Sequence, residues 1–160
     1  MDKKKYYLEL SNSLSALLAG EYDLIASLAN TSALLFERLS GVNWVGFYLN
    51  NGQELVLGPF QGKVACVCIP FDKGVCGLAF THNQTQRVED VHAFPGHIAC
   101  DAASNAEIVF PLRVNDQIIG VLDIDSPNIG QFNQEDEEGL QYLTDQLCQH
   151  LAMCSMPKYY

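Results

Sequence analysis

The spacing of apolar residues changes twice along this chain, from a helical period at both ends to alternation in the middle. Apolar side chains recur at three- and four-residue steps over the first 40 residues and again over 133–154, as in helices that bury one face. Between 42 and 126, apolar and polar residues alternate in short runs separated by turn sequences such as Asn50-Asn51-Gly52. This order predicts an α+β fold, a central antiparallel sheet flanked by N- and C-terminal helices.

The individual elements follow from these runs. We predict helices over 3–18, 22–39, 74–81 and 133–154, and strands over 43–49, 54–57, 64–69, 87–88, 108–114 and 118–124. Gly20 and Gly41 follow the first two helices, and Pro157 ends the last one. A chain of 160 residues has the length of one domain. We therefore predict a single domain over 1–160, with N-terminal helices in 1–40, the sheet and its loop in 42–126, and a C-terminal helix in 133–154.

One stretch, residues 89–106, predicts no regular element. It is rich in His, Pro, Gly, Asp and Ser, and it contains His92, His97 and Cys100. Long loops inside compact domains usually bind or cover something. We therefore expect this loop to carry functional residues.

The charge balance excludes several kinds of partner. The chain has 9 basic and 19 acidic residues, a formal net charge of −10, which disfavours nucleic acids and anionic membranes. Lys3, Lys4 and Lys5 are followed by polar residues rather than by the apolar core of a signal peptide. No apolar run reaches the roughly 18 residues of a membrane span. We expect a cytoplasmic protein with reduced cysteines at rest.

Six cysteines offer redox or metal chemistry, but none form a C-x-x-C pair. Cys148 and Cys154 lie beside the apolar side of the last predicted helix, where a cysteine acts as a small buried apolar residue. A zinc site built from Cys66, Cys68 and Cys100 with a histidine is an alternative, but we favour the hypothesis that these cysteines bind no metal. The remaining thiols are candidates for redox chemistry.

Strand alternation predicts a pocket on one face of the sheet. Side chains alternate across a strand, so Trp44 and Tyr48 share one face of their strand, and Asp123 and Asp125, about 7 Å apart, share one face of theirs. Glu107 lies opposite the aliphatic face of a third strand. If these faces align, aromatic rings and carboxylates line one cavity, which suits a small cationic or zwitterionic ligand with an apolar body. The alternative is a wet face with the acids in solvent.

Four stretches of the sequence together resemble one family. They are GPFQGKVACVCIP, GVCG, QRVEDVHAFPGHIACDAASNAEIVFPL and IIGVLDIDSP. They are similar to the free methionine-R-sulfoxide reductases, stand-alone enzymes of GAF-like fold, over roughly Trp44 to Leu143. Cys66, Cys76 and Cys100, spaced by 10 and 24 positions, match the cysteine trio of that family.

The resemblance implies a role for each matching residue. Cys100 would be the catalytic nucleophile, Cys66 the principal resolving cysteine and Cys76 an auxiliary one, while Cys68 is an extra thiol outside the pattern. The remaining implied site residues are Trp44 and Tyr48 around the methionine side chain, Glu107, Asp123 and Asp125 at the ammonium group and sulfoxide oxygen, and the backbone near Ile98, Ala99 and Cys100 at the carboxylate.

The resemblance also implies a reaction and its partners. The substrate would be free methionine-R-sulfoxide, reduced through a Cys100 sulfenic acid and an intramolecular disulfide. Thioredoxin would recycle the enzyme, a homodimer that needs no metal and no organic cofactor and serves repair after oxidative stress. Clustering would raise the pKa of at least one of the three carboxyls, which supplies a proton donor, with Glu107 among the candidates.

Other interpretations stay open from the residues alone. His97 either lowers the pKa of the Cys100 thiol or is a loop residue bonded to backbone. His82 and His92 are expected at the surface. One alternative function is a GAF module that senses a nucleotide or amino acid and catalyses no reaction. Another is a redox sensor whose cysteines form a regulatory disulfide.

Overall fold

The structure, a computed structural model, describes residues 1–96 and 103–155. Its helices are α1 (Lys3–Leu18), α2 (Leu24–Arg38), α3 (Gly74–His82) and α4 (Gln134–Leu151), with a short 3-10 helix at Val91–Ala93. Its strands are β1 (Trp44–Asn50), β2 (Leu55–Gly62), β3 (Cys68–Ile69), β4 (Gln86–Val88), β5 (Ala106–Val114) and β6 (Gln117–Ser126). They form one antiparallel sheet in the order β3-β2-β1-β6-β5-β4. The predicted α+β class is confirmed.

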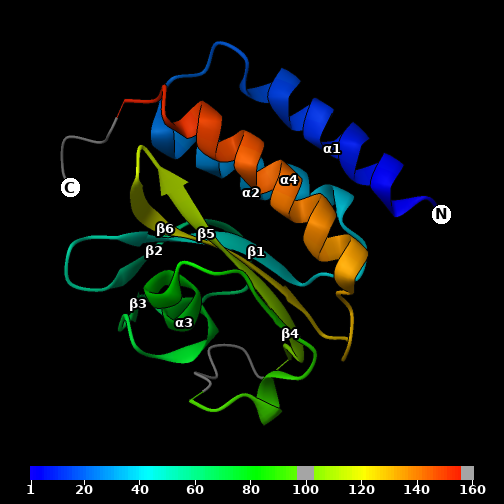
Figure 1. Cartoon of the computed structure of the whole chain (residues 1–160), viewed down its shortest axis with the longest axis vertical. Coiled ribbons are helices and arrows are strands. Elements are labelled where there is room, and N and C mark those ends of the chain that lie inside the picture. Colours follow the sequence, from blue (N-terminus) through cyan, green and yellow to red (C-terminus); the bar gives the residue numbers. More distant parts are fainter. Residues whose placement is uncertain (97–102, 156–160) are drawn as a thin grey trace.

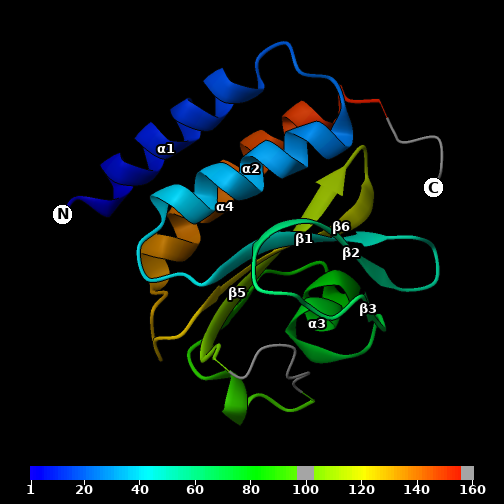
Figure 2. The ribbon, with the colours of Figure 1, turned by 180° about the vertical axis from the view of Figure 1, so that it is seen from behind.

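The helices cover the two faces of the sheet unequally (Figures 1 and 2). α2 and α4 lie against one face, and α1 lies outside them as a further layer. The main core fills the space between these helices and the sheet, with Leu28, Phe47 and Phe110 fully buried in it. α3 lies on the opposite face, over a second cluster that includes Trp44 and Val109. The second face is therefore partly covered, which leaves room for a pocket beside α3.

Capping residues explain where the long helices begin. Asp2 caps α1 and Asp23 caps α2 through side-chain bonds to backbone amides. Asn133, predicted as a cap, forms a capping box with Asp136 at the start of α4. Asp136 also accepts hydrogen bonds from the Tyr7 hydroxyl at 2.7 Å and the Lys3 ammonium at 2.9 Å, which ties α1 to α4. Within the described residues, no helix has both the length and the apolarity to cross a bilayer.

The predicted strand over 64–69 is wrong in its first four residues. Only Cys68 and Ile69 pair with β2, while Val64 and Val67 are 89% and 66% exposed. The carbonyls of Lys63 and Cys66 accept hydrogen bonds from the Trp44 indole and the Tyr48 hydroxyl, and one backbone bond from the Leu57 amide of β2 reaches the Val67 carbonyl. The alternation of apolar residues was real, but the segment passes outside the sheet.

Several other boundaries also differ from prediction. β2 continues to Gly62 because it pairs with β1 as far as Trp44. The stretch 89–106 is not wholly irregular, since a 3-10 helix forms within it and Ala106 opens β5. α4 ends at Leu151 rather than 154, because Ser155 turns back to bond the carbonyl of Tyr22.

Candidate active site

Strand register brings the predicted pocket residues onto one face. On β1 and β6, Trp44 lies opposite Asp125 and Gly46 opposite Asp123. On β5 and β6, Glu107 lies opposite Asp125. Because directly paired residues point to the same side of a sheet, the aromatic and acidic faces coincide. The predicted alignment of the three strands is confirmed, and the acids are not on a wet face.

Two aromatic side chains of β1 form one wall. The Trp44 ring stacks on Tyr48 with a centroid distance of 5.9 Å, and on Phe60 of β2 at 5.2 Å. A Cβ at Gly46 would lie 2.6 Å from the indole and 2.3 Å from the Cβ of Phe60, so only glycine lets the ring lie over the strand. The wall is therefore apolar and closely packed.

The opposite wall is acidic and buried. Glu107 and Asp123 are 7% and 5% exposed, and Asp125 is half-buried. Burial and the Asp123 charge raise the pKa of Glu107 well above its usual range; burial and the Asp125 charge do the same for Asp123. Asp123 Oδ1 is buried without a hydrogen-bond partner. At neutral pH the cluster of Glu107, Asp123 and Asp125 can therefore keep a proton that it can donate to a ligand, and it can also bind a cationic group.

Cys76 lies against the acids, on α3. It is buried, and its thiol points at Glu107 Oε2 with a separation of 4.0 Å. Burial, and to a smaller extent the charges of Asp123 and Glu107, raise the pKa of this thiol well above its usual value. Cys76 is therefore a poor nucleophile in this state. Ligand atoms of Cys76, Glu107 and Asp123 lie within 4.8 Å of one another, a geometry that could also hold a metal ion.

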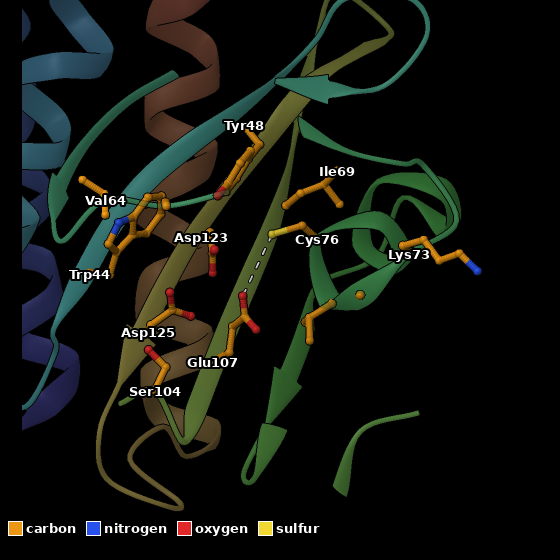
Figure 3. A pocket seen from close by; sticks show the side chains of 13 residues that line it. Trp44, Tyr48, Val64, Ile69, Lys73, Cys76, Ser104, Glu107, Asp123 and Asp125 are labelled. Atoms are coloured by element: carbon orange, nitrogen blue, oxygen red, sulfur yellow. Dashed lines mark hydrogen bonds between the residues drawn. The ribbon is translucent and has the colours of Figure 1, made fainter. Parts of the chain in front are cut away.

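Figure 3 shows these side chains converging on one cavity. The cavity has a volume of about 50 Å³ and is bounded by residues of β1, β5, β6, the 64–69 segment and the first turn of α3. Lys73 and Gly74 at that first turn bring a helix N-terminus to the rim, where the helix dipole favours a carboxylate. The space suits a ligand far smaller than the roughly 300–1,000 Å³ sites of drug-sized molecules.

Comparison with known proteins identifies this arrangement. The family model of the GAF domain matches residues 23–151. The chain is 59% identical to the free methionine-R-sulfoxide reductase of Escherichia coli over 160 residues, covering 100% of this chain and 97% of the relative. It is 41% identical to the Saccharomyces cerevisiae enzyme of that name, covering 89% and 84%. The chain belongs to the free methionine-R-sulfoxide reductases, a group of GAF-domain enzymes.

The fold agreement extends over the same length. The solved structure of a free methionine-R-sulfoxide reductase from Neisseria meningitidis in complex with its substrate has a TM-score of 0.90 and 44% identity, over 96% of this chain and 92% of that chain. The resemblance inferred from the four sequence stretches is thereby confirmed, as is the GAF fold.

The structure places some of the predicted reductase residues and not others. Trp44, Tyr48, Cys76, Glu107, Asp123 and Asp125 all line the cavity. His97, Ile98, Ala99 and Cys100 lie outside the described residues. His82 and His92 are exposed, as expected. Cys148 and Cys154 pack beside the main core, also as expected.

Cys66 and Cys68 differ although only one residue separates them. Cys66 is disulfide-bonded, whereas Cys68 is a free, exposed thiol on β3. Among the described residues, no group with metal-ligand geometry includes either of them, so nothing there favours the zinc alternative.

Sequence reasoning missed several residues of the reductase pocket. Phe60 completes the aromatic wall, and its contribution was hidden because β2 was predicted to end at Leu57. Ser104, buried at the pocket edge, donates a hydrogen bond to Asn43 at 3.4 Å. The first turn of α3 was expected to supply Cys76, but not the helix N-terminus at the pocket rim, where Gly74, with a φ of +66°, turns the chain into the helix.

Proposed function

We propose that this chain reduces free methionine-R-sulfoxide to methionine by thiol chemistry, with Cys100 as the nucleophile. The observation that carries the proposal is the pocket wall of Glu107, Asp123 and Asp125 facing Trp44 and Tyr48. Buried carboxyls opposite aromatic rings match a small zwitterion whose side chain is apolar. Membership of the reductase family supplies the reaction class.

Each end of such a substrate has a complementary wall. The ammonium group can donate hydrogen bonds to the three carboxyl groups. One of their oxygens, Asp123 Oδ1, is buried and has no hydrogen-bond partner, so it can accept such a bond. The methyl and methylene groups can pack on Trp44 and Tyr48. The carboxylate can lie toward the first turn of α3 and the backbone near Ile98 and Ala99. A pocket that meets both charged ends of a free amino acid excludes a residue inside a peptide.

The reaction proceeds in three balanced steps. The Cys100 thiolate attacks the sulfoxide sulfur, and oxygen passes to Cys100 as a proton is taken up, which gives methionine and a Cys100 sulfenic acid. The Cys66 thiol then displaces the oxygen as water and forms a Cys66–Cys100 disulfide. An external dithiol, thioredoxin in our proposal, reduces that disulfide and becomes a disulfide itself. A carboxyl kept protonated by burial, such as Glu107, is the proton donor of the first step.

Three cysteines besides Cys100 are candidates for the resolving thiol, and their surroundings favour Cys66. Cys76 is buried against Glu107, which raises its pKa and holds it as a thiol. A hydrogen bond to Glu54 raises the pKa of the exposed Cys68 thiol. Among the cysteines that the structure describes, Cys66 forms a disulfide, whereas Cys68 and Cys76 are free thiols. This difference favours Cys66 as the resolving cysteine.

Replacing Cys68 by serine should therefore leave multiple turnover within about twofold of wild type. Cys66→Ser should instead release about one methionine per chain and then stall, because the sulfenic acid has no partner. Rapid-quench product counting over the first turnovers, with thioredoxin present, separates the two. Sustained turnover by Cys66→Ser together with a stall in Cys68→Ser would assign the resolving role to Cys68.

The overall proposal is tested by stereochemistry and by substrate size. In a thioredoxin-coupled assay that follows NADPH oxidation, we expect turnover of free methionine-R-sulfoxide and none of the S epimer. A terminally blocked peptide containing the R-sulfoxide should be turned over at least about 100-fold more slowly, since it can form neither charged contact. Equal rates on the peptide would contradict recognition of the free amino acid, and no turnover on either epimer would favour a sensor.

A further inference from the structure

We propose that the segment 63–67 around Cys66, exposed at Lys63, Val64 and Val67, is the docking surface for the protein dithiol that reduces this enzyme. The inference rests on the proposed function, since it requires a disulfide at Cys66 that an external protein must reach. The segment will be called the 63–67 ridge. Its partner is a protein of the thioredoxin type, whose attacking thiol belongs to a C-x-x-C motif with a lowered pKa.

Two exposed valines flank the half-buried Cys66 in sequence. Val64 is 89% exposed and Val67 is 66% exposed, two residues before and one residue after Cys66. None of the valine side chains within the described strands is exposed, and Val45 and Val121 are fully buried. Exposed apolar side chains gathered at a reactive group are typical of a surface that a partner covers.

The ridge is held in place by its backbone. The carbonyls of Lys63 and Cys66 accept hydrogen bonds at 3.1 Å from the Trp44 indole and the Tyr48 hydroxyl, and the Val67 carbonyl accepts one at 2.8 Å from the Leu57 amide. Figure 3 shows Val64 beside Trp44 at the edge of the pocket. Because the segment is already ordered on its inner side, docking on its outer side costs little conformational entropy.

The distribution of charged residues near the ridge also suits docking of a protein partner. The chain has a net charge of −10, yet residues 55–71 contain no Asp or Glu and one basic residue, Lys63. The ridge runs into β3, which is the edge strand of the sheet. A partner can therefore meet the ridge itself through apolar contacts, and the carboxylate of Glu54, hydrogen-bonded to the Cys68 thiol, lies at its β3 end.

The exchange step is balanced within the enzyme and its partner. The partner thiolate attacks one sulfur of the enzyme disulfide, forms a mixed disulfide and releases the other enzyme cysteine as a thiolate. The second partner thiol then attacks the mixed disulfide. Two electrons and two protons pass to the enzyme, whose two cysteines become thiols, and the partner leaves with a disulfide.

The test compares two variants that differ in place but not in chemistry. Val67→Asp changes the ridge, and Ile129→Asp changes a side chain of nearly equal exposure, 65%, in the loop between β6 and α4. Thioredoxin and the small reductant dithiothreitol are supplied in turn, with saturating free methionine-R-sulfoxide. Val67→Asp should raise the KM for thioredoxin about fivefold to tenfold, while Ile129→Asp should not change it. Val67→Ser should lie between wild type and Val67→Asp.

The small reductant separates docking from structure. Turnover with dithiothreitol should be the same in wild type and both variants, because a small dithiol needs no docking surface. Equal KM values for thioredoxin in all three proteins would overturn the inference, and so would a parallel loss with dithiothreitol in Val67→Asp. Failure of the wild type itself with both reductants would instead overturn the proposed function, and the inference with it.

Discussion

Cys100→Ser is expected to lower turnover of free methionine-R-sulfoxide by about three orders of magnitude or more, to the background of the uncatalysed reaction. A serine hydroxyl at this position is too weak a nucleophile to attack the sulfoxide sulfur, and no disulfide step can follow. The residues that we assign to binding are unchanged. Substrate affinity should therefore stay within about threefold of wild type.

The single tryptophan makes both halves of this result measurable. Trp44 is the sole tryptophan of the chain and lines the pocket, so its fluorescence reports substrate binding. A titration of Cys100→Ser gives the dissociation constant, and methionine release gives turnover. Binding with no turnover assigns the chemistry to Cys100. Residual turnover near the wild-type rate would transfer the nucleophile to another cysteine.

The sequence predicted the pocket because the pleat itself encodes which side chains share a face. Trp44 and Tyr48 are four positions apart, and Asp123 and Asp125 are two, so each pair shares one face of its strand. Once β1 and β6 pair antiparallel in register, both pairs must project into one space. Glu107 joined them by the same argument on β5. Alternation could not show how deeply the acids lie, because burial depends on α3 and on the 63–67 ridge above them.

The ridge was predicted incorrectly for a physical reason. Period two indicates an extended strand, but Lys63 to Val67 forms no regular element, and the chain bends at both of these residues. Its carbonyls bond to an indole and a phenol, which are contacts between residues about 18 positions apart. A propensity argument sees neighbours in sequence and cannot foresee such partners. The same limit hid Lys73 and Gly74, at the N-terminus of α3, as part of the pocket rim.

Asp123→Asn is expected to weaken activity and strengthen the fold at once. The change removes a buried carboxylate that we assign to the substrate ammonium, so kcat/KM should fall by about 10–100-fold, the effect of losing a hydrogen bond to a charged group. It also removes a group whose pKa in the folded state is raised by burial and by Asp125. Such a group reduces stability wherever the unfolded chain would ionise it.

The sign of the pH dependence follows from proton binding. Below the unfolded pKa of about 4, Asp123 is protonated in both states and contributes no penalty. As pH rises toward the raised folded pKa, the unfolded chain releases the proton first, and wild-type stability falls. The melting temperature of Asp123→Asn should therefore match wild type near pH 4 and exceed it near pH 8. The shift is roughly 2–4 °C for each kcal/mol in a domain of this size.

A matched surface variant separates this effect from a general change of charge. Asp145→Asn alters an exposed carboxylate of α4 that bonds only to Gln141 among the described contacts, and it should shift the melting temperature little at either pH. Calorimetry of the three proteins across pH 4–8 gives the comparison. If the melting temperature of Asp123→Asn at pH 8 is equal to or below that of wild type, the Asp123 carboxyl does not destabilise the fold. Its unpartnered oxygen is then not kept available for the substrate ammonium at a cost in stability. If Asp123→Asn melts higher and turns over slowly, the pocket holds its acids at a cost in stability because the substrate needs them there.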